Sequence, residues 1–288
     1  MEPKSCYINS QRVRIHYVTW GEAGNPPLIL LHGGRDHARS WDRTALALCD
    51  RYQVFVPDLR GHGDSDWALG GNYSIIDFSL DLHSLVEEIG RTPVTLVAHS
   101  LGGSIALQYA GTVPENVAAV VSIEGLGRLQ WTGAEHRPAH QRMRDWLADM
   151  RKLAGRQPRI YATFEDAVKR MREANGHLSP ELARHLTEHG VREMEDGGFT
   201  WKFDHHVRSR SPYEFNMEDA RDIWNQIRAP ILFIQGAESW GAQDTAADFS
   251  AFHNYRAETV EKAGHWVHHD RFERFLELVE GFLVETSS

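Results

Sequence analysis

Ser100 lies at the centre of the most informative pattern in this sequence. The segment Ala98-His99-Ser100-Leu101-Gly102 directly follows an apolar run at residues 93–97 and directly precedes a helical pattern at residues 103–110. This order predicts a strand, a sharp turn and a helix, with the serine at the apex of the turn. Small residues two positions before and two after such a serine let the strand and the helix approach closely. A serine held in this way is suited to act as a nucleophile.

His265 is the residue expected to activate that hydroxyl. A serine hydroxyl is a poor nucleophile at neutral pH, so the turn implies a histidine base and a carboxylate that orients the base. The chain has 17 histidines, and their number alone decides nothing. The segment Ala263-Gly264-His265-Trp266 follows the last expected strand and precedes the last expected helix. His265 is therefore predicted in a loop at the carboxyl edge of a sheet, the edge at which Ser100 must lie.

Five apolar runs are expected to form the strands that position these groups. The runs are continuous rather than alternating, which is typical of strands buried on both faces and hence of a parallel sheet. They lie at residues 28–31, 52–56, 94–97, 117–123 and 230–234. Alternating apolar residues between positions 7 and 18 predict a short hairpin before them.

Helical patterns separate the strands. Residues 40–48, with Ser40 as the expected N-cap, and residues 74–89 carry apolar side chains at helical spacing. After residue 230 the alternation continues with a helix, a strand and a final helix at residues 244–252, 258–260 and 271–283. Strands that alternate with helices predict an α/β fold with a doubly wound, mostly parallel sheet.

About a hundred residues separate the strand that ends near Glu124 from the next one, which is far too long for a loop in a compact domain. The composition there shifts to Arg, Glu, His and Trp in helical patterns. We therefore expect a mostly helical cap at residues 126–223, inserted into a core formed by residues 1–125 and 224–288. Its expected elements are helices at 136–153, 163–174 and 179–195, the last with Ser179 as N-cap and Pro180 as first residue, and an extended or hairpin segment at 197–203.

Composition limits the classes of partner. The formal net charge is −9, with 31 basic and 40 acidic residues, so no basic surface for nucleic acid is indicated and no polybasic run for anionic lipid is found. The sequence shows neither a signal peptide nor a membrane-spanning stretch, and we expect a cytoplasmic protein that acts on a small molecule. The two cysteines are expected to be free thiols. The sequence leaves open whether the protein forms a homo-oligomer.

Taken together, these motifs resemble those of the α/β-hydrolases that carry a cap and a serine nucleophile, a group that includes esterases and lactonases. The resemblance rests on His32-Gly33-Gly34 after an early strand, on the serine turn and on the late Gly264-His265. It implies an oxyanion hole formed by two backbone N–H groups. These would be the N–H groups of Leu101 and Gly34, with Gly33 as the alternative second donor.

The resemblance leaves the identity of the acid open. In much of the family an aspartate follows the strand that corresponds to residues 231–234, but here that loop has Ser239 where the aspartate commonly stands. Glu238 and the more distant Asp244 are alternatives in the same region. Some family members instead carry the acid one strand earlier, and Glu124 ends that strand here. We favour Glu124, because a carboxylate at a buried strand end requires a partner.

Other polar and aromatic residues suggest fewer roles. Trp131, Trp201, Trp240 and Trp266 could line a substrate pocket. The histidine pairs 136/140 and 185/189 have the spacing of helical metal ligands but lack an accompanying carboxylate pattern, so we expect solvated faces and no metal. The pairs 205/206 and 268/269 are likewise expected at the surface.

The sequence thus predicts a cofactor-free serine hydrolase that cleaves a small, mainly apolar carboxylic ester or lactone through an acyl-enzyme. An alternative is a C–C bond hydrolase or lyase that uses the same Ser-His pair. A further alternative is a non-catalytic, ligand-binding relative that keeps the fold, since the fold alone does not determine the function.

Overall fold

The fold is built on one eight-stranded sheet. A computed structural model describes residues 2–70, 73–126, 138–209, 217–239 and 249–286. The strands are arranged in the order β1-β2-β4-β3-β5-β6-β9-β10. The first two pair antiparallel with their neighbours, and the other six run parallel. The bounds are β1 Lys4–Ser10, β2 Val13–Trp20, β3 Pro27–Leu31, β4 Gln53–Pro57, β5 Val94–His99, β6 Val117–Ile123, β9 Ile231–Gly236 and β10 Tyr255–Val260. The predicted mostly parallel α/β fold is confirmed.

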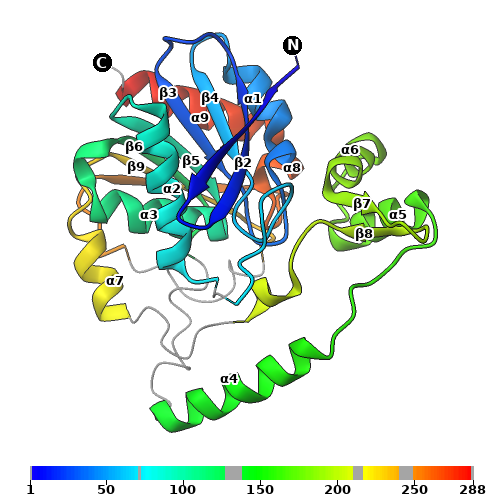
Figure 1. Cartoon of the computed structure of the whole chain (residues 1–288). Coiled ribbons are helices and arrows are strands. Elements are labelled where there is room, and N and C mark those ends of the chain that lie inside the picture. Colours follow the sequence, from blue (N-terminus) through cyan, green and yellow to red (C-terminus); the bar gives the residue numbers. More distant parts are fainter. Residues whose placement is uncertain (1, 71–72, 127–137, 210–216, 240–248, 287–288) are drawn as a thin grey trace.

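Helices cover both faces of the sheet (Figure 1). One face packs against α2 (Ile75–Ile89), α3 (Leu101–Thr112) and α7 (Met217–Trp224), and the other against α1 (Asp42–Leu48) and α9 (Phe272–Thr286). Successive side chains of a strand point to opposite faces, so β3 contributes Ile29 and Leu31 to the first core and Leu28 and Leu30 to the second. The continuous apolar runs of the sequence follow from this double burial.

The starts of two core helices were predicted with different success. Ser74 caps α2, since its side chain accepts a hydrogen bond from the backbone N–H of Asp77. Ser40 was expected to cap α1, and that prediction is wrong. Ser40 lies inside a 3₁₀ turn, η1 (Ala38–Trp41), and its hydroxyl donates to the backbone carbonyl of His37, 2.8 Å away, and to the carboxylate of Asp36. These two acceptors draw the hydroxyl away from the first turn of the helix.

Of the described residues between β6 and β9, those from 138 to 209 lie beside the sheet, whereas α7 packs against it. We call residues 138–209 the inserted segment. It contains α4 (Ala139–Ala154), α5 (Phe164–Ala174), α6 (Pro180–Gly190), the short hairpin of β7 (Val191–Glu193) and β8 (Phe199–Trp201), and η4 (His205–Arg208). Figure 1 shows α4 extending away from the sheet, whereas α5, α6 and the hairpin form a compact group.

The third helix of the inserted segment begins where predicted and ends earlier. The Ser179 side chain accepts from the backbone N–H of Leu182, and Pro180 is the first helical residue. The helix was expected to reach residue 195 but stops at Gly190, because residues 191–193 pair with β8 instead. The hairpin expected near 197–203 is present, and its first strand consists of residues 191–193, which were expected to end the helix.

Side-chain contacts fasten the inserted segment to the core. Near α8 (Val267–Asp270), the Asn175 side chain donates to Asp270 at 2.9 Å, and two further groups of contacts lie elsewhere. Near α1, the His37 side chain bonds to the backbone carbonyl of Leu186 at 2.8 Å. Near α2, the Tyr73 hydroxyl donates to Asp204 at 2.6 Å, the Asp204 N–H donates to the Gly61 carbonyl at 2.8 Å, and Lys202 pairs with Asp64 at 2.8 Å. The second group, which we call the Asp204 tether, fixes the chain that leads into η4.

Among the described residues, no helix combines the length and the apolar character needed to cross a membrane. The helix predicted at 244–252 and the residues Trp131, Trp240, Asp244 and His136 lie wholly or mainly outside the described residues.

Candidate active site

Ser100 occupies a sharp turn between β5 and α3. Its φ of 52° and ψ of −115° put a non-glycine residue in a sparsely populated region of backbone space, so the turn is strained. Gly102 permits the close packing behind it, since a Cβ at this position would lie 2.5 Å from the backbone oxygen of Leu31. The small residue two positions after the serine is therefore required for α3 to approach β3.

His265 meets this serine from the loop between β10 and the short helix α8 (Val267–Asp270). Its Nε2 lies 3.0 Å from Ser100 Oγ, so the serine hydroxyl can donate to a ring whose proton is on Nδ1. The loop is fixed on both sides of the ring. His99 Nε2 donates to the backbone carbonyl of His265 at 2.8 Å, and the Gly264 N–H donates to Asp270 at 2.8 Å.

Glu124 faces the other nitrogen of the same imidazole. Its Oε2 lies 3.4 Å from His265 Nδ1, an ion-pair distance that is longer than an ordinary hydrogen bond. Catalytic hydrogen bonds are often long in the unliganded state and shorten when substrate binds. The Glu124 side chain is only 3% exposed, and its positive φ of 55° turns it back toward the end of the sheet.

Two donors from the loop after β9 hold the Glu124 carboxylate. The Gly236 N–H donates to Oε1 at 2.8 Å and the Ser239 hydroxyl donates to Oε2 at 2.9 Å. Ser239, at the position where relatives commonly carry an aspartate, thus supports the carboxylate of Glu124. Glu238 is not brought to His265. Its half-exposed carboxylate lies 3.6 Å from His177 Nε2.

The loop after β3 lies beside the start of α3. A Cβ on Gly34 would be 3.8 Å from Leu101 Cδ2, and a Cβ on Gly33 would be 2.8 Å from His99 Nδ1. His32 fixes this loop, because its Nδ1 bonds to the Gly33 carbonyl at 2.7 Å while its Nε2 accepts from the Leu59 N–H at 2.9 Å. The structure therefore brings Gly34 and Leu101 together next to Ser100.

A row of buried histidines lies behind His265. His99 and His268 are almost fully buried, their ring centroids are 4.7 Å apart, and His268 stacks on Trp41 at 4.4 Å. Burial lowers the pKa of His99 and of His268 well below the ordinary value. Burial and, to a smaller extent, the charge of His37 lower the pKa of His269 to about 3. These three rings are therefore neutral at pH 7.

The prediction that His268 lies at the surface is wrong, whereas His269 is partly exposed and lines the cavity described below. Their pattern at the start of a short helix resembles a solvated face, but Trp41 of η1 and Phe275 of α9 enclose the first ring. His185 and His189 are also only half exposed, because His185 bonds to the Arg39 carbonyl and lies 3.3 Å from Asp42. The neighbours that bury these rings are distant in sequence, so local spacing does not reveal them.

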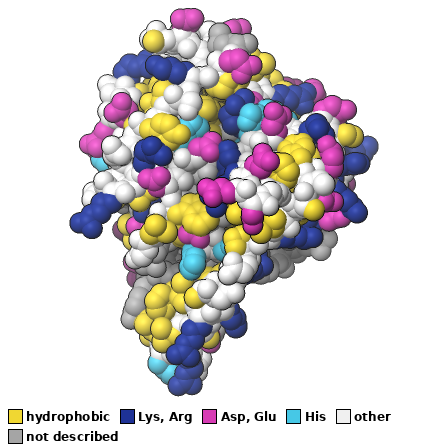
Figure 2. All heavy atoms as spheres, turned by 45° about the vertical axis from the view of Figure 1, so that its right-hand side comes forward, with side chains coloured by type: hydrophobic (Ala, Val, Ile, Leu, Met, Phe, Trp, Pro, Cys, Tyr) yellow, Lys and Arg dark blue, Asp and Glu magenta, His cyan; other side chains and the backbone are white. Residues whose placement is uncertain are grey.

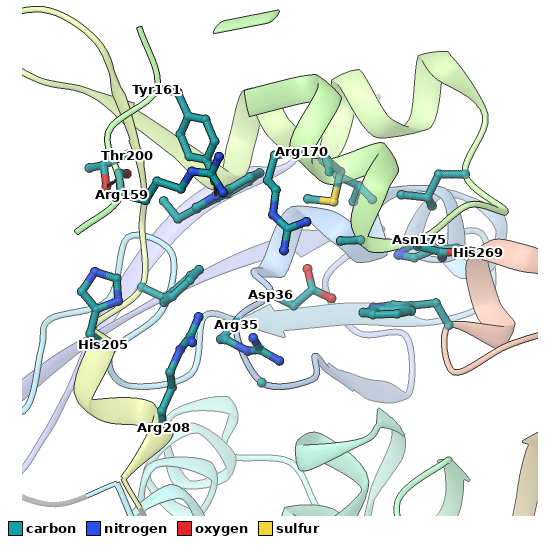
Figure 3. Close-up of a pocket in the computed structure, with 18 of the residues that line it drawn as sticks. Arg35, Asp36, Arg159, Tyr161, Arg170, Asn175, Thr200, His205, Arg208 and His269 are labelled. Carbon is teal, nitrogen blue, oxygen red and sulfur yellow. Dashed lines mark hydrogen bonds between the residues drawn. The ribbon is translucent and has the colours of Figure 1, made fainter. Parts of the chain in front are cut away.

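A cavity of about 420 Å³ opens between the loop after β3 and the inserted segment (Figure 3). At Gly34 and Trp266 it reaches the edge of the sheet that carries Ser100 and His265. Trp201 and Trp266 line it, together with Tyr161 and Phe203. The cavity is less apolar than the predicted substrate requires, because its lining also includes five arginines, namely Arg35, Arg156, Arg159, Arg170 and Arg208.

Three groups of side chains bring potential metal ligands within 4.8 Å of one another: Asp36 with His268 and His269, Asp42 with His185 and His189, and His16 with Asp58 and Asp64. In the second group Asp42 already pairs with Arg39, and in the third Asp58 already bonds to His16. In the first group Asp36 likewise already accepts from the His37 N–H at 2.9 Å and from the Ser40 hydroxyl at 3.1 Å.

Comparisons with known proteins find relatives that match along most of the chain. A serine hydrolase-like protein of Danio rerio is 26% identical over 93% of this chain and 84% of its own length. The esterase Rv0045c of Mycobacterium tuberculosis is 27% identical over 93% of this chain and 86% of its own. A crystal structure of the hypothetical protein PA1622 from Pseudomonas aeruginosa superposes with a TM-score of 0.85 at 23% identity and covers 97% of this chain and 99% of that one.

The family comparison covers most of the chain. The family model described as alpha/beta hydrolase fold matches residues 26–272, a range that includes the serine turn, the Glu124 strand end and the His265 loop. The chain belongs to the alpha/beta hydrolase family.

Proposed function

We propose that this protein is a serine hydrolase that cleaves a small carboxylic ester or lactone through an acyl-enzyme. The observation that carries the proposal is the alignment of three side chains. Ser100 Oγ lies 3.0 Å from His265 Nε2, and His265 Nδ1 lies 3.4 Å from Glu124 Oε2. A nucleophile, a base and a group that orients the base are thus connected through one imidazole.

In the first half of the proposed reaction, Ser100 Oγ forms a bond to the substrate carbonyl carbon while its proton moves to His265 Nε2. Glu124 stabilises the imidazolium that results. The backbone N–H groups of Leu101 and Gly34 donate to the oxyanion, and Gly33 is the alternative second donor. The first N–H of a helix has no intrahelical partner, so that of Leu101 is available for this task.

In the second half, the tetrahedral intermediate collapses, the bond to the leaving oxygen breaks, and His265 returns its proton to that oxygen. A water molecule then attacks the acyl carbon of the Ser100 ester while its proton moves to His265. The bond from that carbon to Ser100 Oγ breaks, His265 returns the proton to Oγ, and the acid product leaves. Every proton passes through one ring, so the proposed cycle needs no cofactor and no metal. The names of the relatives, a serine hydrolase-like protein and an esterase, support the same class of reaction.

The experiment combines turnover with labelling of the serine. A panel of p-nitrophenyl esters of increasing chain length and of simple lactones is offered to the wild-type protein and to Ser100→Ala, and both proteins are treated with a fluorophosphonate. We expect turnover and labelling of the wild type and the loss of both in the variant. Removal of a catalytic serine typically costs at least about 10⁴-fold in kcat.

Other outcomes would redirect the proposal. Labelling of Ser100 without turnover of any ester or lactone would favour the C–C bond hydrolase or lyase alternative. If the wild type shows neither labelling nor turnover, the serine is not activated, and the ligand-binding alternative takes its place.

A further inference from the structure

We call the edge of the sheet that carries Ser100, Glu124 and His265 the catalytic edge. The cavity beside it has the opposite sign of charge to the rest of the protein. The chain as a whole has a formal net charge of −9. Among the described residues, the lining of the cavity includes five arginines and a single carboxylate, that of Asp36. On the face shown in Figure 2, by contrast, acidic and basic side chains are interspersed. A local excess of positive charge is therefore concentrated in a cavity of this acidic protein.

The arginines come from four separate parts of the chain. Arg35 follows β3, Arg156 and Arg159 lie between α4 and α5, Arg170 is on α5, and Arg208 is in η4. Figure 3 shows the side chains of Arg159, Arg170 and Arg208 reaching toward the same hollow from different sides. The convergence is therefore a product of the fold and not of a single basic segment.

Three of these arginines, Arg156, Arg159 and Arg208, differ in their neutralisation from an arginine such as Arg60. Arg60 binds both carboxylate oxygens of Asp81, at 2.6 and 2.7 Å. Within the described ranges, Arg156, Arg159 and Arg208 have no carboxylate within 4.0 Å, whereas Arg170 lies 3.5 Å from Glu173. Arg159 instead lies over the ring of Tyr161.

The cations also repel one another. Burial, and after it the charges of Arg35 and Arg156, lower the pKa of Arg208. Burial and the charges of Arg208 and Arg156 likewise lower the pKa of His205. A bound anion would relieve this repulsion, and the planar guanidinium group is well matched to carboxylate and phosphate oxygens.

We propose that this cavity selects substrates that carry a carboxylate or phosphate group remote from the bond that is cleaved. The inference rests on the proposed function. Trp266 and Gly34 mark the catalytic end of the cavity, the aromatic rings of Trp201 and Phe203 provide its apolar wall, and the arginines bind the anionic end of the substrate. The substrate is therefore an amphiphilic ester with a fixed charge rather than a mainly apolar one.

The test compares two esters that share one leaving group. Mono-4-nitrophenyl glutarate carries a carboxylate at the end of its acyl chain, and 4-nitrophenyl pentanoate has an acyl chain of the same carbon number without the charge. We expect the wild type to prefer the charged ester by about tenfold or more in kcat/KM, since charge-assisted hydrogen bonds contribute about 1.5–3 kcal/mol each, or about 10- to 100-fold.

The variant Arg156→Gln/Arg208→Gln should remove most of this preference. The readout is the ratio of kcat/KM for the two esters within one protein, since a loss that affects both esters alike cancels in this ratio. The matched control is Arg256→Gln/Arg274→Gln, which removes the same charge from partly exposed arginines that pair with Glu285 and Glu277 outside the cavity. The control should keep the preference, which separates local binding from the effect of total charge.

Inhibition distinguishes carboxylate from phosphate as the anionic group. Glutarate and inorganic phosphate are tested as inhibitors of pentanoate hydrolysis, with glutaramide as a neutral control. Competitive inhibition by one anion that is weakened in the double variant identifies the group. Equal inhibition of the wild type and the double variant by every compound would overturn the inference.

Failure of this inference differs from failure of the proposed function. If Ser100-dependent hydrolysis of the pentanoate occurs without any preference for the glutarate ester, the inference is wrong and the serine hydrolase stands. If neither ester is hydrolysed, calorimetric binding of the glutarate ester to Ser100→Ala still tests the cavity. Binding that the arginine substitutions remove would support it, and absence of binding would overturn it.

Discussion

The catalytic edge and the arginine cavity lie side by side but are built in different ways. At the edge, each charged group has fixed partners, as shown by Glu124, which accepts from Gly236 N–H and Ser239 and faces His265. In the cavity, Arg156 and Arg208 have no carboxylate partner among the described residues and raise each other's electrostatic energy. The charged group described at the edge is therefore neutralised without substrate, whereas the positive charge of these cavity arginines is not balanced by carboxylates among the described residues.

This difference suggests a division of labour. In the proposed reaction, the sheet and its end loops position the reacting groups, which requires rigid, buried and satisfied hydrogen bonds. The inserted segment and the loop after β3 form the cavity, where unsatisfied charge is proposed to give specificity. Changes at the edge should therefore alter kcat for every substrate, whereas changes in the cavity should alter the choice among substrates.

The largest expected effect tests the acid at the catalytic edge. Glu124→Gln keeps the shape of the side chain but removes the charge opposite His265, and kcat should fall by about 10⁴-fold, as when the triad acid of a serine protease is amidated. Glu238→Gln, on the partly exposed carboxylate near His177, should change kcat by less than about twofold. Steady-state kinetics with one ester measure both. The reverse pattern would assign the acid to Glu238.

Substitution of Ser239 should lower kcat by a smaller factor, and it tests how the carboxylate of the catalytic edge is held. Ser239→Ala removes the hydroxyl that donates to Glu124, and kcat should fall by about 10- to 100-fold, since a hydrogen bond to a charged group contributes about 1.5–3 kcal/mol. The double variant Glu124→Gln/Ser239→Asp moves the carboxylate to the position that is common in the family. It should recover at least about tenfold of the activity lost in Glu124→Gln. A double variant no better than the single one would show that this loop cannot orient His265.

Stability should depend on pH through the buried histidines next to the edge. Burial lowers the pKa of His32 to about 3 and that of His62 to about 4, so both stay neutral in the folded protein while the unfolded chain binds protons below about pH 6.5. Stability should therefore fall as pH decreases from 6.5, by about 2 kcal/mol per histidine at pH 5. Urea unfolding at pH 7 and pH 5 measures this change, and His62→Gln should reduce the pH dependence. Unchanged stability at pH 5 would contradict the assignment.

The smallest expected effect is that of salt on the preference for the charged ester. Salt should weaken binding in the arginine cavity and leave the reaction at the catalytic edge nearly unchanged. Charges at a partly exposed cavity are screened over a Debye length of about 8 Å at 0.15 M salt and about 3 Å at 1 M, whereas buried pairs are screened much less. Between low salt and about 1 M NaCl, the preference for mono-4-nitrophenyl glutarate should fall several-fold while kcat for 4-nitrophenyl pentanoate stays nearly constant. A parallel loss for both esters would place the salt effect at the catalytic edge.

The catalytic edge could be predicted from the order of strands and polar residues in the sequence. In a parallel sheet all carboxyl ends lie at one edge, so apolar runs followed by Ser100, Glu124 and, later, His265 predict that these groups meet. The structure places them within 3.0 and 3.4 Å of their neighbours. The identity of the acid was harder to predict, because the choice between Glu124 and Glu238 depends on the direction of the chain after each strand.

The arginine cavity could not be predicted in this way. Its five arginines are spread from position 35 to position 208, and each one alone resembles an ordinary solvated side chain. Only the packing of the inserted segment brings them together, and that packing depends on long-range contacts such as His37 with Leu186. The burial of His268 under Trp41 was missed for the same reason.

The Asp204 tether has a consequence for recombining this protein with its relatives. Asp204 and Lys202 lie just before the chain that carries Arg208, but their partners Tyr73, Gly61 and Asp64 belong to the first quarter of the sequence. A chimaera that grafts another inserted segment onto this core therefore needs matching groups at these contacts to keep one wall of the cavity in register. The two parts of the sequence must be inherited together, although about 130 residues separate Tyr73 from Asp204.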